Sequence, residues 1–496
     1  MNAATTPGIG SAPRPALANP VAVLALAAFA VVTAAATAYL TTSSLRTAAT
    51  MVLLLVVIGA YVRSRRAGLI AMWLVWMFSP GLRRILTLAE AGQYSNADPL
   101  ALLPFLATGL MGFEAIRSGV FSTRAKWIMG LAAAGWALGL PAGLHSLNSA
   151  VFAFVAYVTG VTAFAIGYQE RPRKLHDLTL YRVLIFAVPA IAIYGLIQYF
   201  VVMPGWDGLW LTTVDFVTAN APQAGHARVF SLLNSPGTCA AVLGLGLVCY
   251  LITQRVTLAS VTAVVLVVAC LSVTFVRSAW FAVVVAMLAF VLASRGTALR
   301  RVIPLVAVIV LAFSGLSSAN GTAKAVIDRV STFGSLSSDT SANARLDTPT
   351  ALVPIAISTP LGAGLGQAGE SARLGASPFL RNADNGYLAL IYQTGPMGFL
   401  LVMGAALLAF SSSVRRAFRR GARRGDLLVF TLLTFEFIDL LSGDAFYGVL
   451  GVAFWYLLGV GVSAEEDRVD VDQAVAGPSP HSARPVQLKP ASGPAR

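Results

Sequence analysis

The sequence predicts an all-α protein that crosses a membrane many times, and three observations carry this prediction. Hydrophobic residues make up 57 % of the 496 residues, only 11 % are charged, and the mean hydropathy is +0.76. A bilayer core of about 30 Å requires about 20 mainly apolar residues per helix, and runs of this kind recur along most of the chain. The basic residues gather in short clusters between these runs. This composition excludes an ordinary soluble enzyme.

The apolar runs define the expected domain organisation, with about fourteen transmembrane helices. The first run is too long for a signal-peptide core, so it is retained behind a cytoplasmic leader, residues 1–18. Helices 1 to 11 are expected in 19–317, a large extracytoplasmic loop in 318–384, helices 12 to 14 in 385–463, and a disordered cytoplasmic tail in 464–496. The runs cover residues 19–40, 46–62, 67–82, 98–116, 127–145, 148–168, 180–203, 231–252, 257–276, 278–294, 302–317, 385–411, 426–442 and 445–463.

The positions of Lys and Arg predict the orientation, because positively charged loops stay in the cytoplasm. With this number of spans, the main basic clusters share one side and both termini are cytoplasmic, whereas Arg83 and Arg84 fall on the outer side. The net charge of +14 therefore favours membrane orientation over nucleic-acid binding. The clusters are Arg63, Arg65 and Arg66; Arg124 and Lys126; Arg171, Arg173 and Lys174; Arg295, Arg300 and Arg301; and Arg415, Arg416, Arg419, Arg420, Arg423 and Arg424.

Cysteine and histidine usage indicates neither a disulfide framework nor a metal site. Cys239, Cys249 and Cys270 lie inside or beside apolar segments, where a thiol usually packs as a small hydrophobic group. The four histidines lie far apart, and none forms an H-x-x-x-H or H-E-x-x-H pattern. We therefore expect no metal ion and no cofactor.

A polar segment at the outer face precedes the eighth apolar run. Residues 228–239 read Arg-Val-Phe-Ser-Leu-Leu-Asn-Ser-Pro-Gly-Thr-Cys. The sequence that begins at Asn234 delays the start of a helix and leaves backbone N–H groups free to receive an anion. The alternative is an ordinary helix N-cap, with Arg228 extending to the membrane interface.

Arg277 lies between two apolar runs at the outer face. A cation at that position opposes the charge bias and is costly enough to indicate a partner. Its guanidinium group could hold two phosphate oxygens at once. The alternative is a turn arginine that is exposed to lipid headgroups.

The predicted outer loop contains Arg345 and the glycine-rich run Leu361–Gly366, and it ends at Asp384. A nucleotide site is excluded, because the run follows no strand, lacks a Walker lysine and lies on the wrong side of the membrane. The glycines instead predict close backbone packing or a tight turn. Asp384 is a candidate proton acceptor beside Asn385 and Tyr387, although an N-cap at Asp384 or Asn385 is the alternative.

These motifs, in this order, resemble the O-antigen ligase and O-antigen polymerase superfamily of bacterial membrane glycosyltransferases. The resemblance is strongest from about Arg228 to Phe399. Family motifs are matched by Arg228–Gly237, by the junction around Arg277, and by Arg345 with Pro360–Gly366. The closing signature, commonly His-Asn before a helix with Gly-x-x-Gly, is matched by Asp384-Asn385 and Gly395–Gly398. Asp384 stands where the family commonly has His, which favours a polymerase.

The resemblance implies a GT-C-like fold in the bacterial cytoplasmic membrane. It also implies that a glycan passes from an undecaprenyl-pyrophosphate donor to a sugar hydroxyl at the outer face, without a metal ion. Arg277 and Arg345 would be catalytic at the pyrophosphate, and Asp384 would be catalytic at the acceptor hydroxyl. The implied substrate-binding residues are Arg228, Asn234, Asn385 and Tyr387. The implied partners are this donor, a glycan or lipid acceptor, membrane lipids and other polysaccharide-assembly proteins, but no nucleic acid.

Three alternatives to a polymerase stay open. An O-antigen-type ligase would transfer finished polymer to a lipid or protein acceptor, and it shares the donor headgroup. A polysaccharide or lipid transporter should carry ionisable residues near midspan and a repeated architecture. Glu436 and Asp439 are the notable acids in a late span, close to its outer end, and no inverted repeat is evident. The third alternative is an inactive scaffold of a polysaccharide export complex.

Overall fold

The computed structural model describes most of the chain between residues 44 and 476. The described residues are 44–90, 92, 94, 98–172, 175–213, 223–296, 303, 354, 358–374, 385–443 and 446–476. Within these ranges the regular secondary structure is helical and contains no strand, as the sequence predicts. The predicted leader, the first apolar run, Arg345 and Asp384 lie outside the described residues.

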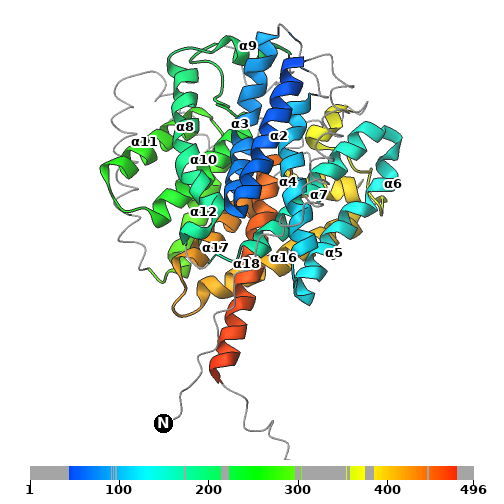
Figure 1. Ribbon diagram of the computed structural model, residues 1–496, viewed down its shortest axis with the longest axis vertical. Helices are drawn as coiled ribbons and strands as arrows, with labels where there is room; N and C mark the ends of the chain where they lie inside the picture. Colours follow the sequence, from blue (N-terminus) through cyan, green and yellow to red (C-terminus); the bar gives the residue numbers. More distant parts are fainter. Residues whose placement is uncertain are drawn as a thin grey trace, which may run out of the picture.

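The helices form one bundle around a continuous apolar core (Figure 1). The long helices are α2 (Ser44–Arg63), α3 (Arg65–Ala89), α4 (Pro99–Ser118), α5 (Thr123–Leu138), α7 (Leu147–Glu170), α8 (Thr179–Phe200), α10 (Pro236–Thr253), α11 (Leu258–Val273), α12 (Arg277–Ala293), α16 (Gly386–Phe418), α17 (Arg424–Asp439) and α18 (Gly448–Ala476). The short elements are α6 (Leu140–Gly143), η2 (Leu144–Ser146), η3 (Leu175–Asp177), α9 (Gly205–Thr213) and η6 (Gly369–Leu374).

Eight helical segments of the described chain are long and apolar enough to cross a membrane. They are Leu45–Arg63, Arg65–Ala89, Pro99–Ser118, Thr123–Glu170, Thr179–Phe200, Pro236–Thr253, Gly386–Phe418 and Gly448–Glu466. Helices α11 and α12 are apolar but shorter, and α17 has 16 residues. The expected count of about fourteen stays a prediction, because two runs, 19–40 and all of 302–317 except Ile303, lie outside the described residues. In addition, α5 to α7 form a single apolar stretch, Thr123–Glu170.

The two ends of the bundle differ in charge. At one end Arg124 and Arg415 both bind Glu465 of α18, and Arg65 donates to the carbonyl of Gln169. We call this end the basic end, and α18 extends beyond it (Figure 1). Helix α9 lies at the opposite end, which we call the outer end after the orientation that the sequence predicts (Figure 1). These three arginines belong to three different predicted clusters, and they lie at one end of the bundle as the charge bias predicts.

Helix α7 and helix α18 pack with their backbones in close contact. A Cβ atom added to Gly167 would lie 2.0 Å from the carbonyl oxygen of Tyr456, and one at Gly459 would lie 2.1 Å from that of Phe164. Small residues allow such approach between membrane helices. This contact holds α18 in the centre of the bundle, where Trp455 and Tyr456 are almost fully buried.

Two predicted boundaries are wrong. Helix α3 continues to Ala89 and does not end near residue 82, because Arg83 and Arg84 find partners inside the protein. The predicted disordered tail from residue 464 is helical as far as Ala476. Its first turn is fixed because Glu465 binds Arg124 and Arg415, and because Ser122 donates a hydrogen bond to Glu466.

Candidate functional site at the outer end

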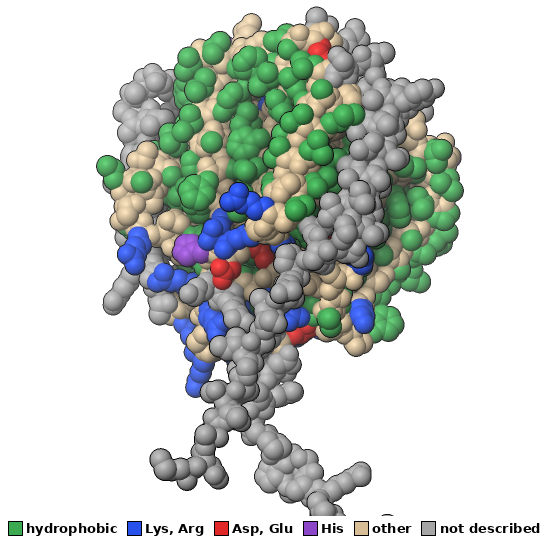
Figure 2. All heavy atoms as spheres, in the orientation of Figure 1, with side chains coloured by type: hydrophobic (Ala, Val, Ile, Leu, Met, Phe, Trp, Pro, Cys, Tyr) green, Lys and Arg blue, Asp and Glu red, His purple; other side chains and the backbone are tan. Residues whose placement is uncertain are grey.

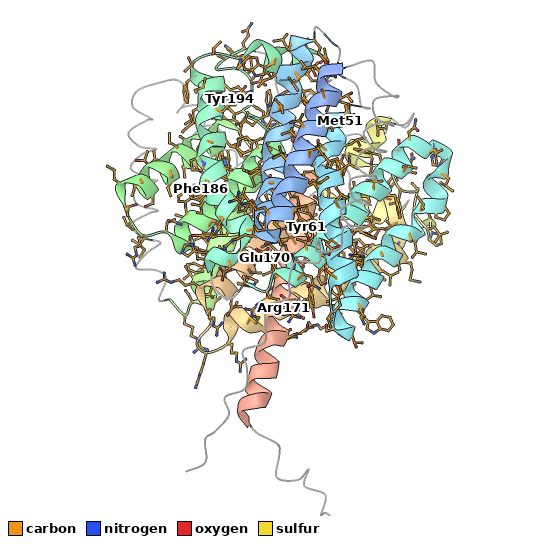
Figure 3. The ribbon with its side chains drawn as sticks, in the orientation of Figure 1. Met51, Tyr61, Glu170, Arg171, Phe186 and Tyr194 are labelled. Atoms are coloured by element: carbon orange, nitrogen blue, oxygen red, sulfur yellow. The ribbon has the colours of Figure 1, made fainter. Side chains whose placement is uncertain are left out.

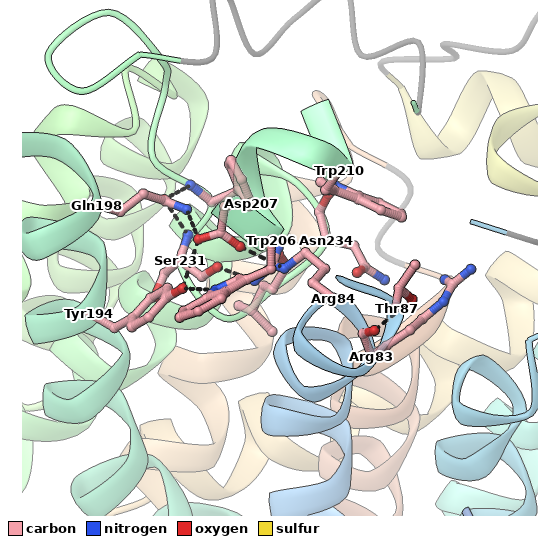
Figure 4. A network of polar contacts seen from close by, with 12 residues as sticks. Arg83, Arg84, Thr87, Tyr194, Gln198, Trp206, Asp207, Trp210, Ser231 and Asn234 are labelled. Carbon is pink, nitrogen blue, oxygen red and sulfur yellow. Dashed lines mark hydrogen bonds and ion pairs between the residues drawn. The ribbon is translucent and has the colours of Figure 1, made fainter. Parts of the chain in front are cut away.

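Arg84 is the centre of a buried polar network at the outer end of α3 (Figure 4). Its side chain is fully buried and forms an ion pair with Asp207 of α9, with 3.0 Å between Nε and Oδ1. The guanidinium group also donates to the carbonyl of Leu233, at 2.6 Å, and to that of Ser231. Its carbon lies 4.8 Å from the ring centre of Phe230. Arg84 therefore joins α3 to the segment that precedes α10.

Asp207 receives further hydrogen bonds from α8. The Tyr194 hydroxyl and the Gln198 amide each donate to Oδ2 at 2.7 Å, and the Trp206 indole donates to the Tyr194 oxygen at 2.7 Å. Burial raises the pKa of Asp207, and the nearby Arg84 charge opposes that shift. The carboxyl group thus fastens the short helix α9 to α8 and α3.

Gln198 and Ser231 fix the turn before α10. The Gln198 side-chain oxygen accepts from the backbone N–H groups of Phe230, at 3.3 Å, and Ser231, at 3.0 Å. Ser231 has a left-handed φ of 52° and donates its hydroxyl to the carbonyl of Ile191 at 2.6 Å. A strained backbone of this kind persists only where its surroundings hold it. The polar segment predicted to bind an anion is therefore rigidly built.

A second ionic cluster lies next to Arg84. Asp98 pairs with Arg46, at 2.8 Å, and with Arg83, at 3.2 Å, and Arg46 also pairs with Glu90 at 2.7 Å. The aromatic rings of Tyr94 and Trp210 lie close to the Arg83 guanidinium group, with centres 5.7 and 5.6 Å from its carbon. Burial raises the pKa of Tyr94 to about 12. These pairs explain why Arg46 and Arg83 are retained at an otherwise weakly basic end.

Arg228 lies against the turn that precedes Arg277. Its guanidinium group donates to the carbonyls of Thr274, at 3.0 Å, and Phe275, at 3.2 Å. The Val229 N–H donates to the carbonyl of Val273 at 3.3 Å. Phe275 has a left-handed φ of 55°. The hydrogen bonds from Arg228 and Val229 therefore support a strained turn between α11 and α12. The structure thus brings two of the predicted site residues together.

Arg277 is the first residue of α12 and is only 8 % exposed. Val276, the N-cap residue, makes no side-chain hydrogen bond to the first turn of α12. The backbone N–H groups of that turn are therefore not occupied by a capping side chain at this position. A guanidinium group and a helix N-terminus both favour an anion at this place.

Asn234 does not cap α10. Ser235 is the cap, accepting from the Thr238 N–H at 3.2 Å, and Pro236 occupies the first helical turn. The Asn234 side chain is exposed, and its carbonyl accepts from the Trp210 indole at 3.4 Å. The N-cap part of the alternative is thus confirmed, with Ser235 in that role, whereas Arg228 binds backbone carbonyls of the turn before Arg277.

The alternate glycines of 361–366 make a turn that lies directly on other backbones. Gly364 has φ 109°, and a Cβ atom there would lie 2.3 Å from the nitrogen of Gly143. Gly366 has φ 83°, and its Cβ would lie 2.4 Å from the carbonyl carbon of Ser149. The prediction of close backbone packing is confirmed, and larger side chains are excluded at these positions.

Gln393 of α16 organises this glycine turn. Its buried side-chain oxygen accepts from the Gly366 N–H at 2.9 Å, and its amide donates to the Tyr157 hydroxyl at 3.0 Å. Gly395 has φ 68° and interrupts α16 just beyond Gln393. The kink and the turn therefore form one unit that joins α16 to α7.

The start of α16 is attached to the end of α17. Asn385 caps α16, its side chain accepting from the Leu388 N–H at 3.1 Å, which confirms the N-cap alternative for this residue. The Tyr387 hydroxyl donates to the carbonyl of Phe437 at 2.7 Å, and the Gly386 N–H donates to that of Leu440 at 2.8 Å. These contacts fix the start of α16 against the end of α17.

Two acids lie on α17 near this attachment. Glu436 is fully buried and Asp439 is 5 % exposed. Both carboxyl oxygens of Glu436 lack a hydrogen-bond partner in the described structure. In the same residues, no group of three or more His, Cys, Asp or Glu side chains could hold a metal ion.

A comparison with protein families finds a match to part of the chain. The family model described as O-antigen ligase matches residues 262–403. The resemblance inferred from the sequence motifs is therefore confirmed, and it supports a membrane function of the O-antigen ligase and polymerase type. No curated protein matches the chain significantly in sequence.

The residues that match the O-antigen ligase family, 262–403, include Arg277, the glycine turn, Asn385 and Tyr387, whereas Arg228 precedes them. The described site residues form two groups at the outer end. Arg228 binds the turn that directly precedes Arg277 at the start of α12, and Asn385 and Tyr387 lie at the start of α16 against α17.

Sequence reasoning missed Arg84, Asp207, Gln198 and Gln393 as the residues that build this end. The available signal for Arg84 was its position with Arg83 on the outer side, against the charge bias. Gln198 and Gln393 lie within apolar helices and give no comparable signal. Their roles follow from segments far apart in the sequence that meet only in the folded chain.

Proposed function

We propose that this protein is a bacterial membrane glycosyltransferase that uses a polyprenyl-pyrophosphate-linked glycan as donor and a sugar hydroxyl as acceptor. The observation that carries the proposal is the position of Arg277. It lies among the residues that match the O-antigen ligase family, at the first residue of α12, almost buried, at the end of the bundle opposite the basic clusters. The basic end would face the cytoplasm, so transfer would occur at the outer face of the cytoplasmic membrane.

Arg277 and Arg345 would stabilise the leaving group. In the transfer, the acceptor oxygen bonds to the anomeric carbon while the bond from that carbon to the pyrophosphate oxygen breaks. Negative charge then grows on the pyrophosphate, and guanidinium groups can compensate it without a metal ion. The N–H groups of the first turn of α12 favour the same charge. Arg228 would act mainly by holding the turn before Arg277, because its side chain binds the carbonyls there.

Asp384 would accept the proton of the acceptor hydroxyl. A carboxylate within hydrogen-bond reach is a competent general base. Asn385 and Tyr387, the residues that follow Asp384 closely in the sequence, support this role because they fix the start of α16. Asn234, exposed beside the start of α10, would contact a headgroup or sugar from the donor side.

A polymerase is the favoured form of this activity, because Asp384 occupies the position at which the family commonly has His. A ligase that transfers finished polymer to a lipid or protein acceptor is the second candidate, supported by the description of the matching family. Both forms share the donor site, so the acceptor distinguishes them.

The deciding experiment is an envelope glycan profile of the host after deletion of the gene. Loss of long polymer with single repeats remaining would identify a polymerase. Lipid-linked polymer that accumulates without reaching its acceptor would identify a ligase. Complementation with wild type, Arg277→Ala and the control Arg255→Ala, an exposed residue at the basic end, tests the site. We expect Arg277→Ala to fail and Arg255→Ala to succeed; full complementation by Arg277→Ala would reject the assignment.

A further inference from the structure

A second charged site lies at the basic end, on the face formed by α2, α3 and α8. Figure 2 shows basic side chains and a histidine gathered below a broad hydrophobic area on this face. The residues concerned, which we call the Arg66–Arg182 cluster, are Arg63, Arg65, Arg66, His176 and Arg182. None of them takes part in the outer site described above.

Two arginines of the cluster converge on one point. Arg66 and Arg182 both donate to the carbonyl of His176, from Nη2 and Nε respectively. The ion pair of Arg66 with Asp177 is long, at 3.7 Å, and both side chains are 40 % or more exposed. Such an exposed pair contributes little. Among the described residues, the positive charge of Arg66 is therefore only weakly compensated.

The cluster retains unused hydrogen-bond donors. Arg66 Nε and Arg65 Nη2 are buried and have no hydrogen-bond partner among the described residues. The Arg66 side chain as a whole is 40 % exposed, so an acceptor outside the protein can approach its guanidinium group, whose donors the described residues do not fully use. Planar guanidinium groups match the oxygens of a phosphate in particular.

Hydrophobic side chains extend from the cluster toward the middle of the bundle. Phe186 of α8 is 79 % exposed, Val62 of α2 is 43 % exposed and Leu74 of α3 is 39 % exposed. Figure 3 shows Tyr61 and Phe186 on this face, with Glu170 and Arg171 nearer the basic end. An apolar area that adjoins a cationic cluster fits an amphipathic ligand whose head is an anion.

We propose that the Arg66–Arg182 cluster is a binding site for one anionic phospholipid. Arg66 and Arg182 bind the phosphodiester, and an acyl chain lies against Phe186. Free phosphate would match the arginines alone, whereas a phospholipid also matches the adjoining apolar face, and we therefore assign the lipid. The site is separate from the outer site and does not depend on the proposed glycosyl transfer.

The test is native mass spectrometry of the full chain in detergent, titrated with phosphatidylglycerol, phosphatidylcholine or inorganic phosphate. We expect tighter retention of phosphatidylglycerol than of phosphatidylcholine. The Arg66→Gln/Arg182→Gln variant should bind phosphatidylglycerol roughly thirtyfold more weakly, because each basic residue near an anionic surface contributes about 1 kcal/mol. Arg66→Gln alone should bind phosphatidylglycerol roughly fivefold more weakly. Phe186→Ser should lower the affinity for the lipid but not for inorganic phosphate.

The matched control is Arg117→Gln/Arg255→Gln, which removes two exposed charges from the same end outside the cluster. It should leave phosphatidylglycerol affinity unchanged. The proposal is overturned if this control weakens binding as much as the cluster variant, or if the folded Arg66→Gln variant binds like wild type. It is also overturned if phosphate competes fully and Phe186→Ser has no effect, because that result would identify a free-phosphate site.

Discussion

Arg84 and Asp207 form an ion pair in which both side chains are fully buried, between the outer end of α3 and the short helix α9. The pair holds together three segments that the sequence separates widely, since Arg84 also binds the carbonyls of Ser231 and Leu233. Removal of one member of a buried pair leaves the other charge without compensation. The outer end should therefore depend on both residues.

Arg84→Leu should reduce the stability of the protein by about 3 to 5 kcal/mol. The substitution exposes Asp207 to an apolar environment and leaves two carbonyl groups without their donor. The loss would be seen as a lower Tm of the detergent-solubilised chain. Arg117→Leu, at a side chain that is 48 % exposed, should lower Tm little. Equal Tm values for Arg84→Leu and wild type would contradict this role.

The Asp207 carboxyl group should make stability depend on pH. Burial raises its pKa in the folded chain above the unfolded value of about 3.9. Protonation therefore favours the folded state: the contribution of this group is complete below the unfolded pKa and is lost as pH rises through the folded pKa. We expect the Tm of wild type to fall relative to that of Asp207→Asn as pH rises from about 4. Asp177→Asn, at a side chain that is 43 % exposed, is the control, and a parallel course of wild type and Asp207→Asn would contradict the prediction.

Gly364→Ala should be strongly destabilising, by about 3 kcal/mol or more. The residue has φ 109°, and the new methyl group would meet the Gly143 nitrogen at 2.3 Å. Neither backbone can move without breaking the hydrogen bonds of the turn to α16 and to Gly139. Gly59→Ala is the matched control, because nothing lies within 4 Å of its Cβ position. Thermal unfolding of both variants should differ clearly, and similar Tm values would show that the turn tolerates a side chain.

Hydropathy alone was sufficient to predict an all-helical chain with several membrane-spanning helices, because the bilayer imposes a length and an apolar composition on each one. The same reasoning placed Arg277 at a helix junction and gave close packing as a role for the glycines of 361–366, since φ and side-chain size are local properties. The end of α3 was predicted wrongly, because two arginines after an apolar run have the same local sequence pattern as the start of a charged loop. Only the approach of Asp98 and Asp207 from other segments makes Arg83 and Arg84 helical and buried.

Gln393→Leu should destabilise the joint between α16 and α7. The substitution keeps the volume but leaves the buried Gly366 N–H without its acceptor and removes the bond to the Tyr157 hydroxyl. An unsatisfied buried donor costs about 1 to 3 kcal/mol. A Tm of Gln393→Leu at or above that of wild type would show that these hydrogen bonds do not contribute.

Glu436→Gln should leave the stability of the protein unchanged or raise it. Glu436 is fully buried, its carboxyl oxygens have no hydrogen-bond partner in the described residues, and Asp439 follows one turn later on α17. An ionised carboxylate without a partner in such surroundings costs several kcal/mol, whereas an amide of the same shape carries no charge. Asp426→Asn is the matched control on the same helix, because Asp426 is buried in an ion pair with Arg416 and its loss should lower Tm. If Glu436→Gln lowered Tm as much as Asp426→Asn, the Glu436 carboxylate would have to be bound by a further group in the folded protein.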